Sequence, residues 1–404
     1  MGVEGLMVKL ARVVVGSIVT VLLAATPAAA NPGGQPLQIK SASLSQDGQE
    51  LVWRLVMQQP FSPGALAHDG RSLCLLLERA QNGSVAGQVC AISGVGPQAR
   101  PRLAYQRVTV AGAGRARIIP ATVSRTSSED LTASFLASDA GLRYVPLRWQ
   151  VQNTLAPPGC TPPTPNRIGC FSVFPAKPAL TRLHTPQLVG CIASGPEFVS
   201  NGPPNVHDVA LTFDDGPWGA PPSSDFVGLL AREHVPATFF EIGDQIGTYD
   251  PRGTVERQML ADGDMIGDHT WSHPDMTTLS ASGQRAQLSA AAAAIKRATG
   301  FEPCLFRAPY GAVNSTLLST ARELGFSTIQ WDVDPRDWSL PGTGAIYANV
   351  VANARDGSIV IQHFGGGPRY ETLAALPQEI ATLRARGYQF VTVAQMLGYQ
   401  LIYR

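Results

Sequence analysis

Strand-like and helix-like segments alternate along the second half of the chain, from residue 208 onward. Apolar runs such as Val209–Phe213 and Ala237–Glu241 are separated by amphipathic stretches, and the Ala-rich stretch Ala281–Thr299, ended by Gly300, is the clearest. This alternation is typical of β-α units, in which helices cover a parallel sheet. It predicts an α/β fold, a distorted and incomplete (β/α) barrel, whose functional residues gather at the carboxyl ends of the strands. The other predicted elements are Ser224–His234, Met265–Asp268, Ser315–Leu324, Thr328–Trp331, Ile359–His363 and Thr372–Arg386.

The first half of the chain has a different pattern, with short apolar runs separated by turn signals such as Asp47-Gly48. No amphipathic helix interrupts these runs, so we expect an all-β, sandwich-like accessory domain of unknown role over residues 31–175. A Pro-rich stretch follows, which predicts a linker over residues 176–204 before a catalytic domain over residues 205–404. The predicted strands are Leu51–Met57, Ser72–Leu77, Leu103–Val110, Leu131–Leu136 and Leu147–Val151.

The N-terminus has the features of a secretory signal peptide. Lys9 and Arg12 precede the apolar run Val13–Ala25, and the small residues Ala28-Ala29-Ala30 follow. This order predicts a signal peptide over residues 1–30, and the run is shorter than the roughly 20 residues that span a bilayer. We therefore expect a secreted, extracellular or cell-wall-associated protein with no permanent membrane span after cleavage. An uncleaved signal is the alternative.

All six cysteines follow this segment. An even number of cysteines in an exported chain favours disulfides, and no C-x-x-C pair points to zinc or redox chemistry. The local pairs Cys74–Cys90 and Cys160–Cys170 are favoured because each falls within one predicted hairpin or loop. That choice leaves Cys191 and Cys304 for each other, and buried free thiols are the alternative.

The charge of the chain is balanced, with 31 basic and 30 acidic residues and a formal net charge of +1. Such a chain has no broad electrostatic field to attract nucleic acid or an anionic membrane. We therefore expect no nucleic-acid partner. We also expect the protein to be a monomer.

Carboxylates and imidazoles follow two of the predicted strands. Asp214 and Asp215 are adjacent at a strand end, and because side chains alternate along a strand they should have different tasks. His269 and His273 follow another strand, with a spacing that would place both on one face of a helical turn. Two imidazoles and one carboxylate make a site for Zn²⁺ that leaves positions open for water and substrate. Taken singly, each motif could instead be an ordinary turn or a pair of surface histidines.

Three further motifs follow predicted strands, and they read Arg307-Ala-Pro-Tyr310-Gly311, Asp334-Pro-Arg-Asp337-Trp338 and Ile361-Gln-His363. With the two motifs above, and in this order, they resemble the polysaccharide deacetylase family, also called NodB-homology or carbohydrate esterase family 4. The resemblance covers residues from about 207 to 400 and does not extend to the first half of the chain. It implies a metal-dependent hydrolase that removes acetyl groups from N-acetylated or O-acetylated polysaccharide, such as peptidoglycan, chitin-like or xylan-like chains.

The resemblance also implies which residues would bind metal and activate water. Asp215, His269 and His273 would hold one divalent metal ion, with Zn²⁺ the ion that this ligand set favours. Asp214 would be the general base, and Arg307 would pair with it.

The remaining motif residues would act on the leaving group and the acetyl group. His363 would be the general acid, oriented by Asp337, and the backbone N–H of Tyr310 would stabilise the oxyanion. The walls of the substrate site would be formed by Pro309, Trp338 and Ile361. The aromatic Trp338 and the branched aliphatic Ile361 lie at strand ends and could also be ordinary core residues.

Two positions depart from the family's common pattern. Phe364 and the glycines at 365–367 follow His363, where many relatives have an acidic residue, and Ile361 stands where leucine is usual. The first departure affects groove shape and substrate choice more than catalysis. Two alternatives remain open, the same fold acting on a non-sugar amide and a catalytically silent carbohydrate-binding protein. The intact acid, base and ligand positions argue against the second.

Overall fold

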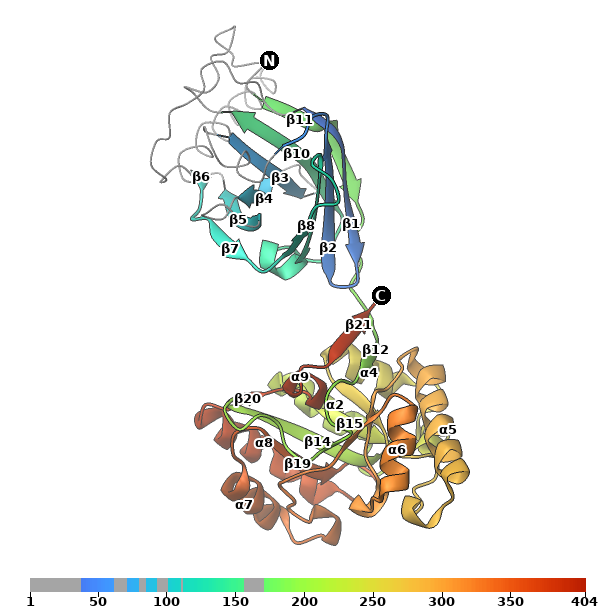
Figure 1. The fold of residues 1–404 in the computed structure, drawn as a ribbon. Helices are drawn as coiled ribbons and strands as arrows, with labels where there is room; N and C mark the ends of the chain where they lie inside the picture. The colour runs from blue at the N-terminus through green and yellow to red at the C-terminus, as the bar shows by residue number, and fades with distance from the viewer. Residues whose placement is uncertain (1–37, 62–70, 80–84, 93–100, 110–111, 156–170) are drawn as a thin grey trace, which may run out of the picture. The chain divides into compact units, whose positions relative to one another are not determined.

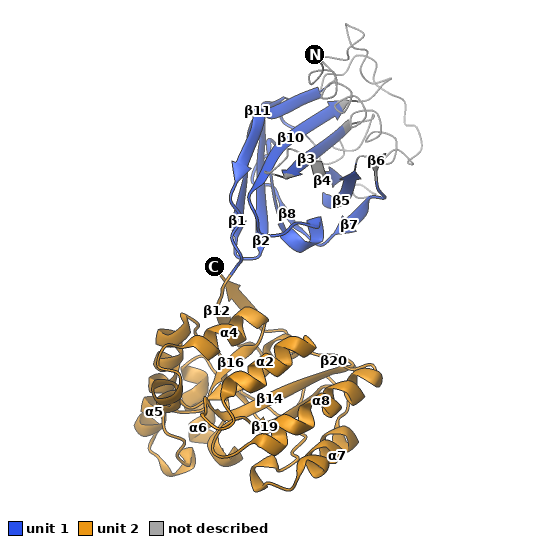
Figure 2. Ribbon diagram, turned by 180° about the vertical axis from the view of Figure 1, so that it is seen from behind, with its two compact units in different colours: residues 1–186 blue, residues 187–404 orange. Residues whose placement is uncertain are grey.

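The computed structural model describes residues 38–61, 71–79, 85–92, 101–109, 112–155 and 171–404 (Figure 1). The chain divides into two compact units, residues 1–186 and residues 187–404 (Figure 2). In the described part of the chain, strands predominate in the first unit, whereas strands and helices alternate in the second.

Two antiparallel sheets pack face to face in the first unit. Its strands are β1 (Ile39–Asp47), β2 (Glu50–Met57), β3 (Arg71–Arg79), β4 (Val85–Ile92), β5 (Arg102–Thr109), β6 (Gly112–Ala113), β7 (Arg117–Ile119), β8 (Thr122–Ser124), β9 (Asp130–Leu136), β10 (Leu147–Leu155) and β11 (Phe171–Thr181). One sheet has the order β1-β2-β9-β8, and the other has the order β11-β10-β3-β4-β5-β6 with β7 also paired to β5. Alternate side chains such as Leu51 and Trp53 of β2 and Leu73 and Leu75 of β3 fill one shared core. The predicted all-β sandwich-like class is confirmed.

Strand β11 differs from the predicted linker because it runs through Pro175 and Pro178. It lies at the edge of its sheet, and its pairing with β10 jumps from Ala179 to Phe174, so both prolines fall in the gap. Proline lacks an N–H for the ladder, and an edge strand or a bulge tolerates this loss. The units divide after residue 186, so residues 176–186 belong to the first unit and residues 187–204 to the second.

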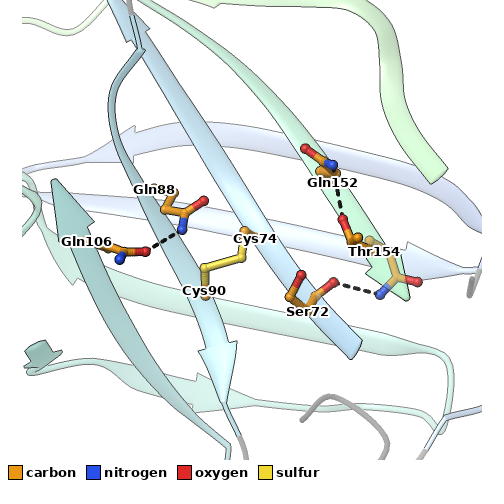
Figure 3. The surroundings of a disulfide bond; sticks show 8 residues. Ser72, Cys74, Gln88, Cys90, Gln106, Gln152 and Thr154 are labelled. Carbon is orange, nitrogen blue, oxygen red and sulfur yellow. Dashed lines mark hydrogen bonds between the residues drawn. A yellow bond between two sulfur atoms is a disulfide. The ribbon is translucent and has the colours of Figure 1, made fainter. Parts of the chain in front are cut away.

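Two of the predicted disulfides are present. Cys74 on β3 is bonded to Cys90 on the neighbouring β4, beside the hydrogen-bonded side chains of Gln88 and Gln106 (Figure 3). The second bond joins Cys191 and Cys304. The predicted Cys160–Cys170 pair lies outside the described residues.

The second unit is an α/β domain built on a curled parallel sheet. Its strands are β12 (Leu188–Ile192), β13 (Phe198–Val199), β14 (Asp208–Gly216), β15 (Thr238–Glu241), β16 (Met265–Asp268), β17 (Leu305–Phe306), β18 (Ser327–Ile329), β19 (Ser358–His363), β20 (Gln389–Phe390) and β21 (Gln400–Tyr403). The sheet order is β13-β18-β17-β16-β15-β14-β19, with β20 beside β14, and β12 pairs separately with β21. After β18 the chain forms a bridge from Val333 to Val360 of β19, which curls the sheet into the predicted incomplete barrel.

Helices cover this sheet (Figure 1). They are α2 (Ser223–Glu233), α3 (Gly243–Tyr249), α4 (Thr254–Asp262), α5 (Ala281–Thr299), α6 (Ser315–Glu323), α7 (Thr343–Asn353), α8 (Tyr370–Ala385) and α9 (Val393–Met396). Helix α5 matches its predicted range because the Ser280 side chain accepts a hydrogen bond from the N–H of Gly283 and Gly300 ends the helix with a φ of 80°. No helix in the described residues has the length and apolarity needed to cross a membrane.

An aromatic cluster fills the domain core beside β14 and β19. Phe213 packs on Phe239 with ring centroids 5.3 Å apart, and Phe364 packs on Phe239 at 5.0 Å. Phe364 is fully buried, and a Cβ added to Gly216 would lie 2.0 Å from its ring. The phenylalanine that stands in place of the family's acidic residue is therefore a core residue and does not shape the groove directly.

Candidate metal centre and active site

The carboxyl ends of β14, β16 and β19 lie at one end of the curled sheet, where they border a pocket of about 440 Å³. The predicted residues Arg307, Pro309 and Asp337 stand behind this pocket, and the other predicted residues line it. Ala308, Trp331 and Asp334 also line it, and none of these three was predicted as a site residue. The complete lining is Asp214, Asp215, His269, His273, Ala308, Tyr310, Trp331, Asp334, Trp338, Ile361 and His363.

Asp215, His269 and His273 form a candidate metal site. Oδ1 of Asp215 lies 3.3 Å from Nε2 of His269 and 3.1 Å from Nε2 of His273. The ligand atoms of all three residues lie within 4.8 Å of one another. Oδ1 is buried and has no hydrogen-bond partner in the described part of the chain, as expected of an oxygen arranged to face a cation. One carboxylate and two imidazoles fit a divalent transition-metal ion.

The surroundings of these three side chains also suit a metal. Burial alone would raise the pKa of Asp215, but the imidazoles of His269 and His273 hold it well below its usual range. Nδ1 of His269 lies 2.8 Å from the carbonyl oxygen of Arg307, so Nε2 is the ring nitrogen directed toward Asp215. Nδ1 of His273 lies 3.2 Å from Oη of Tyr310. Both Nε2 atoms therefore face the Asp215 carboxylate.

The prediction that a helical turn brings the two histidines together is wrong. The segment between them is a loop in which Thr270 has a φ of 71° and His273 has a φ of 58°. The N–H of His273 donates to Oγ1 of Thr270 at 3.0 Å, which closes the loop. Non-glycine residues with positive φ are uncommon and cost free energy, so the surrounding fold must impose this conformation.

Asp214 forms a buried ion pair with Arg307. Nη1 of Arg307 donates to Oδ1 of Asp214 at 2.7 Å and to Oγ1 of Thr212 at 2.8 Å. The guanidinium also donates to the carbonyl oxygens of Ile329 and Gln330. Burial lowers the pKa of Arg307, and the Asp214 carboxylate opposes this effect. The other carboxylate oxygen, Oδ2 of Asp214, lies 3.8 Å from Nε2 of His269, which also neighbours Asp215. The two aspartates differ in their other partners, because Arg307 binds Asp214 and His273 lies beside Asp215.

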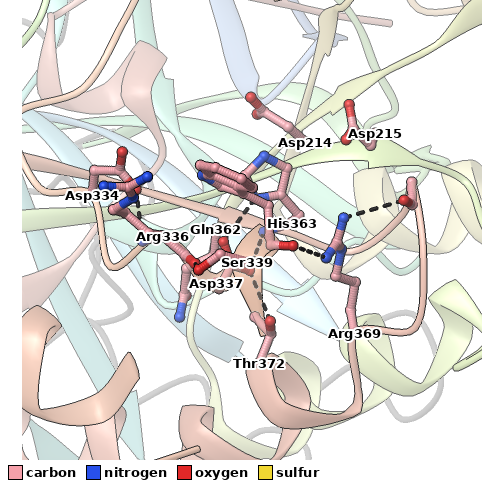
Figure 4. A network of polar contacts seen from close by, with 12 residues as sticks. Asp214, Asp215, Asp334, Arg336, Asp337, Ser339, Gln362, His363, Arg369 and Thr372 are labelled. Atoms are coloured by element: carbon pink, nitrogen blue, oxygen red, sulfur yellow. Dashed lines mark hydrogen bonds and ion pairs between the residues drawn. The ribbon is translucent and has the colours of Figure 1, made fainter. Parts of the chain in front are cut away.

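On β19, His363 is held by Asp337 (Figure 4). Nδ1 of His363 donates to Oδ1 of Asp337 at 2.7 Å, and the backbone N–H of His363 donates to Oδ2 at 2.8 Å. Burial alone would lower the pKa of His363, but Asp337, with the charges of Asp215 and Asp214, raises it to about 9. His363 is therefore a proton donor at neutral pH, with its free Nε2–H on the side away from Asp337.

The remaining predicted residues differ in exposure. Trp338 and Tyr310 are 49% and 71% exposed at the mouth of the pocket, whereas Ile361 is 4% exposed. Pro309 is buried in the turn that carries Tyr310, whose φ is 61°. Trp338 and Ile361 therefore line an apolar part of the pocket, and Pro309 supports the turn.

The sequence also matches known proteins over this domain. The sequence profile described as polysaccharide deacetylase matches residues 201–329. A peptidoglycan-N-acetylglucosamine deacetylase of Bacillus cereus is 36% identical over 200 residues, which cover 49% of this chain and 92% of that protein. The chain belongs to the polysaccharide deacetylase family. The resemblance predicted from the five motifs is confirmed.

Other members of the family match the same share of the chain. Peptidoglycan-N-acetylglucosamine deacetylase PgdA of Listeria monocytogenes is 37% identical over 193 residues, which are 48% of this chain and only 39% of that protein. A chitooligosaccharide deacetylase of Bradyrhizobium sp. is 34% identical over 203 residues, covering 47% of this chain and 91% of that protein. A crystal structure of the Bc1960 peptidoglycan N-acetylglucosamine deacetylase aligns at 32% identity over 50% of this chain and 93% of that chain, with a TM-score of 0.48.

Two polar residues at the start of α8 were not predicted from the family motifs. Oγ1 of Thr372 donates to Oδ2 of Asp337 at 2.8 Å, and Arg369 binds backbone carbonyls of the loop after His363. Neither residue falls in a motif. Asp337 is 35 residues from Thr372 along the chain, and the partners of Arg369 are backbone oxygens, which every residue has, so no local pattern could have indicated them.

Proposed function

We propose that this protein is a metal-dependent hydrolase that removes acetyl groups from polysaccharide containing N-acetylglucosamine. The main support is that Asp214, His363 and the three candidate metal ligands line one pocket. Relatives whose length this chain covers almost completely are named as peptidoglycan-N-acetylglucosamine and chitooligosaccharide deacetylases, which supports this substrate class.

In this proposal Asp215, His269 and His273 hold one divalent ion. Zn²⁺ is the ion that we propose, because one carboxylate and two imidazoles match its preferred ligands. Such an ion, when bound, acts as a Lewis acid and makes water a better nucleophile at neutral pH.

Asp214 acts as the general base. Arg307 donates to its Oδ1, which fixes the carboxylate and leaves Oδ2 to accept a proton from the attacking water. The backbone N–H of Tyr310 stabilises the oxyanion that the attack creates, an interaction worth about 3–4 kcal/mol in other hydrolases.

His363 acts as the general acid. An amine is a poor leaving group unless it is protonated, and the Nε2–H of His363 supplies that proton. Asp337 binds Nδ1 and so directs Nε2 toward the pocket. The exposed ring of Trp338 and the side chain of Ile361 pack against the acetyl methyl group.

We further propose that the protein is exported. The disulfides Cys74–Cys90 and Cys191–Cys304 support an oxidising compartment, as does the signal-like segment of residues 1–30. The β-sandwich unit would then be an accessory domain outside the cell.

Acetate release tests this function. Metal-depleted protein, with and without added Zn²⁺, is incubated in parallel with N-acetylated chitin oligomers, peptidoglycan and acetylated xylan. We expect the zinc-loaded protein to release acetate from the two N-acetylglucosamine polymers in preference to xylan, and metal depletion to abolish release. If the zinc-loaded protein releases acetate from none of the three polymers, or if metal depletion leaves release unchanged, the proposal fails.

A further inference from the structure

Arg369 lies just before α8 and is 6% exposed. In contrast to Arg307, its hydrogen-bond partners in the described residues are backbone carbonyl oxygens. Nε donates to Gly365 at 2.8 Å, Nη2 donates to Gly366 at 3.2 Å, and Nη1 donates to Trp338 at 3.2 Å. Burying a guanidinium costs free energy, so a buried arginine that binds three carbonyls indicates a site where the backbone must be held.

The loop that Arg369 binds is pressed against the candidate metal ligand Asp215. A Cβ added to Gly365 would lie 1.9 Å from the carbonyl oxygen of Asp215, and one added to Gly366 would lie 2.6 Å from Oδ2. No side chain larger than hydrogen fits at either position without displacement. Because the loop covers Oδ2, it restricts rotation of the carboxylate and keeps Oδ1 toward His269 and His273.

The start of α8 also supports the opposite side of the pocket. Thr372 donates to Asp337, which orients His363 (Figure 4). Arg369 binds the backbone carbonyl of Trp338, the residue after Asp337. The first turn of α8 and the residue before it therefore hold two segments. One is the glycine loop over the candidate metal ligand Asp215, and the other is the segment that carries Asp337 and Trp338.

We propose that Arg369 is a positioning residue that sets the orientation of Asp215 by holding the Gly365–Gly366 loop against it. The link to catalysis rests on the proposed function, whereas the predicted effect on metal binding can be measured without any substrate.

The test is the Zn²⁺ affinity of metal-depleted protein, measured by competition with a chromophoric chelator. Arg369→Met keeps much of the side-chain volume but has no donors, and it should weaken affinity by about 10-fold to 100-fold. Arg369→Lys should give an intermediate affinity, because an ammonium can still donate to some of the carbonyls. The matched control is Arg384→Met, on the same helix, whose exposed guanidinium binds Glu233 and should not affect the affinity.

A second variant tests the loop itself and does not depend on the folding of the arginine variants. Gly366→Ala leaves Arg369 intact but places a methyl group against Oδ2 of Asp215, at a φ of 68°, and should also weaken Zn²⁺ binding. Circular dichroism and the thermal midpoint establish which variants are folded. Wild-type affinity in folded Arg369→Met or Gly366→Ala would overturn this inference alone. Absence of Zn²⁺ binding by the wild-type protein would instead overturn the proposed function.

Discussion

Replacing Asp337 by asparagine should change the pH dependence of amide cleavage. Asp337 accepts hydrogen bonds from Nδ1 and the N–H of His363 and from Oγ1 of Thr372. Burial alone would lower the pKa of His363, but Asp337, with the charges of Asp215 and Asp214, raises it to about 9. Because this pKa is raised, the proton-donating form is present below that pH and is lost as the pH rises through it.

The size of the effect follows from the two pKa values. Without the Asp337 charge, and with burial unchanged, the pKa of His363 should fall toward its ordinary value of 6.5. At pH 8 a group with a pKa of about 9 is about 90% protonated, and one with a pKa of about 6.5 is about 3% protonated. The Asp337→Asn variant should therefore lose about 30-fold in amide cleavage at pH 8, but less than about 2-fold at pH 6.

The assay is kcat/KM for a chitin oligomer between pH 5 and pH 10, compared with an activated acetate ester. The ester has a leaving group that needs no proton, so its hydrolysis should show little of this pH-dependent loss. Thr372→Val is the matched control, because it removes one hydrogen bond to Asp337 and keeps the carboxylate charge. An equal loss at every pH and for both substrates would show that Asp337 does not set the pKa of His363 and is a structural residue only.

Two further predictions concern stability. Arg307→Met should lower the free energy of unfolding by about 3–5 kcal/mol, because it leaves the buried Asp214 carboxylate without its partner. In urea unfolding, the double variant Arg307→Met/Asp214→Asn should recover part of this stability. If the double variant recovers none of it, the ion pair does not account for the loss. The Cys191–Cys304 bond closes a segment of 113 residues, so replacing both cysteines by alanine should cost about 3–5 kcal/mol. Identical urea midpoints for this variant and the wild type would contradict that estimate.

The sequence could predict that the site residues lie close together, because their proximity follows from the topology of the parallel sheet. Parallel strands end at the same side of a barrel, so residues after Val209–Phe213, Met265–Asp268 and Ile359–His363 had to lie near one another. Helix α5 was predicted to the residue from its Ala-rich stretch and from Gly300, a strong local signal for the end of a helix, and the structure adds Ser280 as its N-cap. Helix α7, by contrast, has no side-chain cap and was not predicted.

Features that depend on distant contacts could not be predicted. Trp338 is 31 residues from Arg369 along the chain, and the contact uses a backbone oxygen, which every residue has. The positive φ of 74° at Asp215 and of 58° at His273 is imposed by neighbouring segments, since neither residue type requires it. The prolines of β11 favour a linker locally, and only the position of β11 at the sheet edge and the break in its pairing with β10 explain why a strand tolerates them.

The metal content of two isosteric variants distinguishes the proposed roles of the adjacent aspartates, Asp214 as base and Asp215 as metal ligand. Asp214→Asn removes the proton acceptor but none of the proposed ligands, so it should retain one Zn²⁺ per chain while kcat falls by about 10²–10⁴-fold. Asp215→Asn replaces an anionic ligand by a neutral one and should lose the metal, with activity partly restored by excess Zn²⁺. Elemental analysis of the purified proteins measures both outcomes. A metal-free Asp214→Asn variant, together with an Asp215→Asn variant that keeps both metal and activity, would contradict these two roles.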